Sequence, residues 1–348
     1  MRRYPPERLI AFAEQVLRAV GVRPDHGRVT AQRLVEADMR GRGGHGLIRL
    51  PLYVSRIEAG GVNLDPDIRV VRENRVSALV DGDNGLGQPV MTLATEIAIA
   101  KAREEGVAWV GTVHSNHAGA AGVYTAMALR HDLAAIYFAV ANGNAMPPWG
   151  GKERLLGTNP IAAAFPAGEE IPFQLDIATT VASHGSIKVK AQAGEPLPEG
   201  WVVDEEGRPI TDPDRADEGF LLPIGGYKGA GLTFMIGVLA GIMNGAAFGR
   251  DVVEFRKDLG TPTNTGQAIL VLRPDLFIDM EEYRKSMDRH LRDFRSSASM
   301  TGDRVRLPGE WAWEREQESL RLGVPLPEEL VVRLDELAQR VGSPARLG

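Results

Sequence analysis

Continuous apolar runs that alternate with helical patterns constrain the fold of this chain most strongly. The run VAWVGTV at 107–113 precedes a helical pattern at 118–131, and a second run, LAAIYFAV, follows at 133–140. Two shorter strand patterns, IAAAF and FQLDI, come next. Such runs are typical of strands buried on both faces, and the short connections between strands favour a mixed sheet over a purely parallel one. The sequence therefore predicts an α/β fold whose mixed sheet is covered by helices.

Both ends of the chain have helical character. Residues 6–20 place their apolar side chains on one helix face, and residues 25–40 form a second helical pattern with Asp25 as the expected N-cap. We expect three regions: an N-terminal helical region at 1–67, a central α/β domain at 68–278 with an irregular excursion at 194–225, and C-terminal helices at 279–348. The two terminal regions are expected to pack together as a helical cap.

The composition excludes several classes of function. The chain has 348 residues, a net charge of −6 and no cysteine. Nucleic-acid binding requires concentrated positive charge, and disulfides or thiolate metal sites require cysteine. The sequence has neither the apolar segment of a secretory signal nor a run of about 18 apolar residues that could span a membrane. We therefore expect a cytoplasmic protein that acts on a small molecule, with no nucleic-acid or membrane partner.

The stretch GRGGHG at 41–46 matches the pattern G-x-G-x-x-G. A dinucleotide fingerprint follows a strand and opens a helix, whereas a helical pattern precedes this stretch, and no strand ending in an acidic residue follows about 20 residues later. The glycines are typical instead of a helix end followed by a turn. His45 and Arg49 stand four residues apart and share one face if the segment is helical, so they are candidate site residues.

The stretch VHSNHAGAAG at 113–122 is a second candidate. His114 and His117 lie between a buried strand and a helix of small residues. The dipole at a helix N-terminus disfavours the imidazolium form, and a neutral imidazole can accept a proton near pH 7. The two histidines also form an H-x-x-H pattern, but the sequence nearby supplies no third metal ligand, so we predict no metal site. The structural alternative is that one histidine only caps the turn.

Three further motifs place polar groups beside buried strands or at a helix start. Thr158 and Asn159 lie in a loop rich in proline and glycine, where ligand contacts are often built. Asp176 ends an apolar strand, where its carboxylate can bind a histidine or a ribose, or cap a helix. Lys228 lies among glycines before an apolar helix, and backbone amides with an ammonium group there can bind phosphate.

Together these motifs resemble the type-2 malate/L-lactate dehydrogenase family, which includes ureidoglycolate and sulfolactate dehydrogenases and a piperideine-2-carboxylate reductase. The resemblance extends over about residues 6–275. The motifs, in order, are DMRGRGGHGLIRLPLYVSRIEAGG, NHAGAAG, PWGG…LGTNPIAAAFP, LDIATT, LPEGWVVDEEGRPITDP and KGAGL. The resemblance implies NAD(P)-dependent oxidoreduction on a non-Rossmann fold, in a homodimer with its cleft near the subunit interface.

The resemblance also implies a set of site residues. His117 corresponds to the proton acceptor, His45 and Arg49 to residues that face the substrate, and Thr158 is the expected further substrate contact. The cofactor is expected to be NAD, with NADP as the alternative. Its expected contacts in the central domain are Asn142, Asp176, Ile177, Ala178, Lys228, Pro262, Thr263 and Asn264. The family usually carries serine directly before this His-Gly pair, whereas this chain has Gly44, so the identity of the substrate stays open.

The predicted reaction interconverts a small 2-hydroxy acid, of the malate or L-lactate type, and its 2-oxo acid. Arg49 is expected to hold the substrate carboxylate, and His117 to exchange the proton of the reacting oxygen while hydride is transferred. One alternative is a cyclic imino-acid reductase that uses the same residues. A more distant alternative is a metal-dependent hydrolase or metal-binding module built on His114, His117 and His45.

Overall fold

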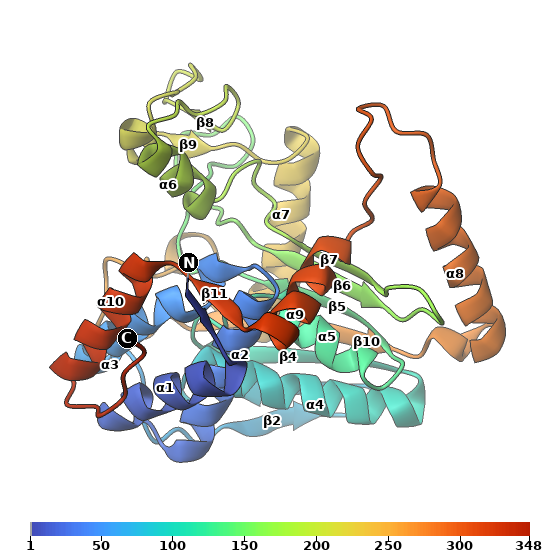
Figure 1. Ribbon diagram of the computed structural model, residues 1–348, viewed down its shortest axis with the longest axis horizontal. Coiled ribbons are helices and arrows are strands. Elements are labelled where there is room, and N and C mark those ends of the chain that lie inside the picture. Colours follow the sequence, from blue (N-terminus) through green and yellow to red (C-terminus); the bar gives the residue numbers. More distant parts are fainter. Residues whose placement is uncertain (1) are drawn as a thin grey trace.

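The computed structural model describes residues 2–348, and its largest sheet is mixed (Figure 1). In spatial order its seven strands are β2 (Arg69–Glu73), β3 (Ser77–Asp81), β4 (Val107–Ser115), β10 (Thr265–Leu272), β5 (Ala134–Ala139), β6 (Ile161–Phe165) and β7 (Phe173–Ile177). Strands β3 and β4 pair in parallel, and the other neighbours pair antiparallel. The predicted α/β fold with a mixed sheet is confirmed.

Both faces of this sheet are covered, as the apolar runs predicted. Helices α4 (Gly87–Glu105) and α5 (Gly122–Leu129) contact one face, and α7 (Tyr227–Ala240) contacts β5 and β10. Alternate residues of β5 enter different cores: Tyr137 packs in the cluster with α4 and α5, whereas Phe138 packs in the cluster with α7. This alternation follows from the two-residue period of a strand.

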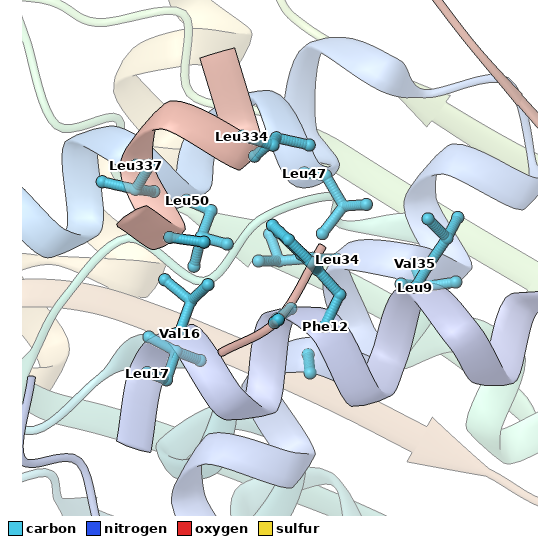
Figure 2. Close-up of a cluster of buried hydrophobic side chains, with 14 of the residues drawn as sticks. Leu9, Phe12, Val16, Leu17, Leu34, Val35, Leu47, Leu50, Leu334 and Leu337 are labelled. Atoms are coloured by element: carbon cyan, nitrogen blue, oxygen red, sulfur yellow. The ribbon is translucent and has the colours of Figure 1, made fainter. Parts of the chain in front are cut away.

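The two ends of the chain form one helical cap, as predicted. Its elements are β1 (Arg2–Tyr4), α1 (Pro6–Ala19), α2 (Pro24–Met39), α3 (Leu50–Glu58), α9 (Glu310–Leu322), β11 (Val324–Leu326) and α10 (Glu328–Arg340). Strand β1 pairs with β11, and Figure 1 shows α10 beside the N-terminal helices. Figure 2 shows Leu9, Phe12, Leu34, Leu50 and Leu334 in one buried cluster, so both chain ends share a single core.

The remaining elements flank the central sheet. They are α6 (His184–Ala193), β8 (Val202–Val203), β9 (Phe220–Leu221), α8 (Met280–Arg295) and short 3₁₀ helices at Gly43–His45, Leu47–Arg49, Pro213–Glu218, Ile242–Asn244, Gly249–Asp251 and Pro274–Leu276. The carboxylate of Asp288 on α8 accepts hydrogen bonds from backbone amides at 168–170, between β6 and β7. No helix within residues 2–348 is long and apolar enough to cross a membrane.

Two local predictions are wrong. Asp25 is not the N-cap of α2, because Pro24 begins the helix, Arg23 occupies the cap position and the Asp25 carboxylate pairs with Arg23. Helix α5 begins at Gly122 rather than at 118, so His117 lies in an irregular segment between β4 and α5. Its environment must therefore come from tertiary contacts rather than from a helix N-terminus.

Candidate functional site

A cleft of about 690 Å³ lies where the helical cap meets the central sheet. Seven of the residues predicted from sequence line it: His45, Arg49, His117, Asn142, Thr158, Asp176 and Ala178. The other five predicted residues, Ile177, Lys228, Pro262, Thr263 and Asn264, are not part of its lining. The structure thus brings together the three candidate catalytic side chains, which come from two distant segments of the chain.

The segment that carries His45 and Arg49 is fixed from behind by the core. Leu47 and Leu50 are buried in the cluster of Figure 2, while His45 and Arg49 line the cleft. The buried carboxylate of Asp38 accepts a hydrogen bond of 2.8 Å from the amide of Leu47. Burial raises the pKa of Asp38 to about 7, against the amide's smaller lowering effect.

Two glycines give this segment its shape. A Cβ atom at Gly46 would lie 2.0 Å from an oxygen of Asp38, so only glycine allows the carboxylate to approach. Gly44, by contrast, lines the cleft, and a Cβ atom there would have no heavy atom within 4 Å. The carbonyl oxygen of Gly44 accepts a hydrogen bond of 2.7 Å from Nε of Arg49, which orients the guanidinium group.

His117 is held through its Nδ1 atom. The hydroxyl group of Tyr53 on α3 lies 2.7 Å from Nδ1, and Nε2 of Gln88 on α4 donates to the same hydroxyl at 2.8 Å. A hydroxyl group both donates and accepts, so Tyr53 can serve either neutral tautomer and the protonated ring. Because Nδ1 is engaged, Nε2 is the ring nitrogen available to a ligand in the cleft.

Three aromatic rings form a stack with His117 in the middle. The ring centroid of His45 lies 5.5 Å from that of His117, with 14° between the two planes. The ring centroid of Phe255 lies 5.1 Å from that of His117, with 15° between the two planes. The amide of Phe255 donates to the carbonyl oxygen of Asn142, which ties the ring to the cleft wall. The stack restricts the orientation of both imidazoles.

Both cleft histidines are kept neutral at pH 7. Burial by the surrounding protein lowers the pKa of His117 well below its usual value, and the charges of Arg49, His45 and Arg256 lower it further. The His45 ring stays open to the cleft, but protein atoms on its other sides and the charges of Arg49, Arg256 and Arg42 likewise hold its pKa far below 6.5. The predicted neutral form is therefore present, with burial and arginines as its cause.

Arg256 belongs to a loop that a buried arginine fixes. The Arg56 side chain is only 2% exposed, and it donates to the carbonyl oxygens of Phe255, Asp258 and Thr261. These bonds join α3, which carries Tyr53, to the loop that carries Phe255 and Arg256. Sequence reasoning did not identify Tyr53, Gln88, Arg56, Phe255 or Arg256, since no local motif marks them.

Asp176 lines the cleft, and its hydrogen bond and ion pair within residues 2–348 involve no histidine. Its Oδ2 accepts a hydrogen bond of 3.0 Å from the amide of Gly122, the first residue of α5, and lies 4.0 Å from Nε of Arg42. Burial raises the pKa of Asp176, although Arg42 and the Gly122 amide act in the opposite direction. The carboxylate does not cap the following helix, as one alternative from sequence had it: Ser183 caps α6, and Asp176 instead accepts from the start of α5, which precedes it in the chain.

Two other predicted positions, Thr263 and Asn264, have structural contacts outside the cleft. The hydroxyl group of Thr263 donates to the carbonyl of Ser115, and Oδ1 of Asn264 accepts from the amide of His114. Both contacts support the turn that leads to His117. Lys228 is exposed in the first turn of α7.

His114 does not line the cleft. Its Nδ1 lies 3.0 Å from a carboxylate oxygen of Asp81. In the described part of the chain, no group of three or more His, Asp or Glu side chains is arranged to hold a metal ion.

The cleft has the chemistry that a dinucleotide requires. The apolar part of the wall is formed by Ala139, Ala141, Ala178 and Pro160. Short polar groups come from Asn142, Thr158 and Ser183. Arg42 and Lys188 add positive charge for phosphates. The volume lies within the range of cofactor pockets, so the residues present fit a nicotinamide dinucleotide.

Comparison with known proteins identifies similar chains of the same length. A family model described as malate/L-lactate dehydrogenase matches residues 4–335. A malate dehydrogenase of Pyrococcus horikoshii is 37% identical over 98% of this chain and 96% of its own. An L-sulfolactate dehydrogenase of Methanocaldococcus jannaschii is 37% identical over 97% of this chain and 96% of its own. The solved sulfolactate dehydrogenase from that organism gives a TM-score of 0.90 at 35% identity, with 98% of each chain covered.

Other relatives widen the range of cofactor and substrate. A (2R)-3-sulfolactate dehydrogenase of Chromohalobacter salexigens, 37% identical over 92% of this chain and 94% of its own, is named for NADP(+). A ureidoglycolate dehydrogenase of Escherichia coli O157:H7, 33% identical over 93% and 92%, is named for NAD(+). The structure of a delta1-piperideine-2-carboxylate reductase from Pseudomonas syringae gives a TM-score of 0.85 at 29% identity, over 97% and 100%. These matches confirm the resemblance found in the motifs.

Proposed function

The chain belongs to the malate/L-lactate dehydrogenase family of NAD(P)-dependent enzymes, and from this premise we propose that it interconverts a small 2-hydroxy acid of the malate or L-lactate type and its 2-oxo acid. We propose NAD as the cofactor, with NADP as the alternative, since relatives use either one. The observation that carries the proposal is the position of His117: one ring nitrogen is held by Tyr53, and Arg49 and His45 line the same cleft.

In the proposed mechanism, Arg49 binds the substrate carboxylate and so fixes the position of the carbon that reacts. His117 takes the hydroxyl proton on Nε2 during oxidation, while its Nδ1 is held 2.7 Å from the hydroxyl group of Tyr53. His45 donates a hydrogen bond to the reacting oxygen or to the carboxylate. When bound, the nicotinamide supplies the group that accepts or donates hydride.

The proposed cofactor contacts have two kinds of support. Asn142, Asp176 and Ala178 line the cleft, and Thr158, proposed as a substrate contact, lines it as well. For Ile177, Lys228, Pro262, Thr263 and Asn264 the proposal rests on the family resemblance alone.

The central test is His117→Ala. We expect kcat to fall by roughly 10²–10⁴-fold while binding of NADH, followed by its fluorescence, survives. His114→Ala is the matched control, because His114 is only three residues away but pairs with Asp81 outside the cleft. An unchanged kcat of the His117 variant, with any accepted substrate, would remove His117 from this role.

A cyclic imino-acid reductase is the second candidate, because the same histidines and Arg49 could bind and protonate a C=N bond beside a carboxylate. A panel of pyruvate, oxaloacetate and piperideine-2-carboxylate, with NADH and NADPH followed by absorbance, separates the two. Preferred reduction of the imine would replace the 2-oxo acid assignment. The metal-dependent alternative has no support from the described residues, which contain no candidate metal cluster.

We also propose that the protein acts as a homodimer, as the resemblance implies. Large apolar side chains are exposed along α7 and the turn that follows it: Tyr227, Phe234, Met235, Ile242 and Met243. An apolar surface of this kind is typical of a protein interface. Light scattering of the purified protein measures the mass directly, and a monomer at working concentration would contradict the proposal.

A further inference from the structure

The histidine end of the cleft carries more positive charge than one substrate carboxylate requires. Arg49 and Arg256 both line it, and both lower the pKa of His45 and of His117. No carboxylate acts on either histidine in the opposite direction. Burial and the charge of Arg256 likewise lower the pKa of Arg49. Two arginines thus face the same space, and within residues 2–348 neither guanidinium forms an ion pair; the Glu254 carboxylate accepts only from the backbone amide of Arg256, at 3.4 Å.

The acidic residues of the cleft wall are engaged elsewhere or lie apart from the histidines. Asp176 accepts from the Gly122 amide and pairs with Arg42. Glu254 is packed against Gly143, where a Cβ atom would lie 2.2 Å from its carboxylate. Glu329 lines the cleft from α10, as does a further cation, Arg333. None of the three acidic residues contributes to the pKa of His45 or His117.

The two arginines come from two different segments of the chain, and they are close enough for Arg256 to lower the pKa of Arg49. Arg49 follows His45, which stacks on one side of His117, and Arg256 follows Phe255, which stacks on the other. The bonds from Arg56 to the carbonyl oxygens of Phe255 and Asp258 fix the backbone on both sides of Arg256. A substrate whose reacting oxygen meets His117 therefore meets two cations, Arg49 and Arg256, that line the same cleft.

We propose that Arg256 binds a second anionic group of the substrate, so that the site selects 2-oxo and 2-hydroxy acids with a carboxylate or sulfonate at the far end. This inference rests on the proposed function and deepens it. A guanidinium group binds either anion through paired hydrogen bonds, and an unpaired arginine in a cleft leaves that interaction unused when the substrate has only one charge. Pyruvate and cyclic imino acids have a single anionic group and are therefore disfavoured.

Arg256→Gln tests the proposal, because it removes the charge and keeps a polar side chain. We expect kcat/KM for oxaloacetate to fall by about 10- to 100-fold, the loss typical of a charge-assisted hydrogen bond, and kcat/KM for pyruvate to change much less. Arg250→Gln is the matched control: Arg250 lies six residues earlier, is exposed and pairs with Glu153 outside the cleft. Circular dichroism and the melting temperature establish that each variant folds.

The outcomes separate this inference from the function on which it rests. A selective loss with oxaloacetate supports the proposal, and 3-sulfopyruvate in the same assay shows whether Arg256 binds a sulfonate, a carboxylate or both. Equal losses with oxaloacetate and pyruvate, or an unmodified protein that reduces pyruvate as efficiently as both dianions, overturn the proposal and leave the dehydrogenase assignment intact. Failure of the unmodified protein to reduce any 2-oxo acid with NADH or NADPH overturns the proposed function and this inference with it.

Discussion

Tyr53→Phe removes the one oxygen atom that joins Gln88 to His117 and leaves the buried ring in place. The hydroxyl lies 2.8 Å from Nε2 of Gln88 and 2.7 Å from Nδ1 of His117. Gln88 is completely buried, and its Oε1 already has no hydrogen-bond partner. The substitution therefore leaves both polar atoms of a buried amide unpaired, and it leaves Nδ1 of His117 with only the longer, 3.3 Å hydrogen bond from the Gly119 amide.

These losses predict separate effects on stability and rate. A buried polar group without a partner costs about 1–3 kcal/mol, so the free energy of unfolding is expected to fall by that amount. One neutral hydrogen bond contributes about 1 kcal/mol to the orientation of His117, which corresponds to a fall in kcat of roughly five- to tenfold. This effect is far smaller than the loss expected for His117→Ala, since the imidazole itself remains.

The double variant Tyr53→Phe/Gln88→Leu distinguishes the two effects. Leucine removes the unpaired amide, so urea unfolding should show stability recovered toward that of the unmodified protein. Steady-state assays should show kcat still reduced, because His117 Nδ1 still lacks the Tyr53 hydroxyl. A Tyr53→Phe variant with normal kcat, or a double variant that recovers kcat as well as stability, would refute the role assigned to Tyr53.

Two further substitutions test the segment that carries His45. For Gly44→Ser we expect a free energy of unfolding within about 0.5 kcal/mol of that of the unmodified protein, because a Cβ atom there meets only the open cleft. Activity should be retained, with altered ratios of kcat/KM among 2-oxo acids. A large drop in melting temperature would show that the space is filled. For Asp38→Asn, the difference in free energy of unfolding between the variant and the unmodified protein should depend on pH. The folded-state pKa of Asp38 is raised from 3.8 to about 7, so its stabilising contribution is present below about pH 4 and is lost as the pH rises through 7. The original protein should lose up to about 4 kcal/mol relative to the variant across that window, measured by urea unfolding, and a constant difference would contradict the argument.

Local sequence patterns sufficed for the layers of the fold. The apolar run at 107–113 and the amphipathic pattern at 6–20 each report burial through their own periodicity, and both became the expected elements, β4 and α1. The sequence did not reveal that β10 lies between β4 and β5, because strand pairing between distant segments leaves no local signal. Asp25 shows the limit of cap rules, since α2 begins at Pro24, two residues before the start that an N-cap at Asp25 would give.

For the site as well, residues in local motifs could be predicted from the sequence, whereas residues that act through distant contacts could not. His45, Arg49 and His117 stand in short motifs and were found, and the structure places all three in one cleft. Tyr53 and Gln88 sit at ordinary core positions of helices, so nothing in their neighbourhood distinguishes a hydrogen-bonding role from packing. The neutral state of His117 was expected for the wrong cause, because the helix start was placed too early and Arg256 lies in a loop far along the chain.

The charges around His117 also make a prediction about pH. Burial, Arg49, His45 and Arg256 together hold the pKa of His117 well below 6.5, and within residues 2–348 the titratable side chains of Tyr53 and His45 contact the ring. In hydroxy-acid oxidation His117 must be unprotonated, so kcat/KM falls as the pH decreases through this pKa. Arg256→Gln removes one repulsive charge; the pKa should rise toward 6.5, and the acid limb of kcat/KM should move to higher pH.

This shift is independent of substrate affinity, because a weaker contact lowers kcat/KM at every pH without moving the limb. The unmodified protein and Arg256→Gln are assayed with the same hydroxy acid over about two pH units on either side of 6. Ionisation of the substrate then affects both pH profiles equally and drops out of the comparison. Arg250→Gln, whose charge lies outside the cleft, should leave the limb in place. A limb that stays fixed or moves to lower pH in Arg256→Gln would mean that Arg256 does not act on His117, and that the residue reaches the substrate, if at all, from farther away than the ring stack implies.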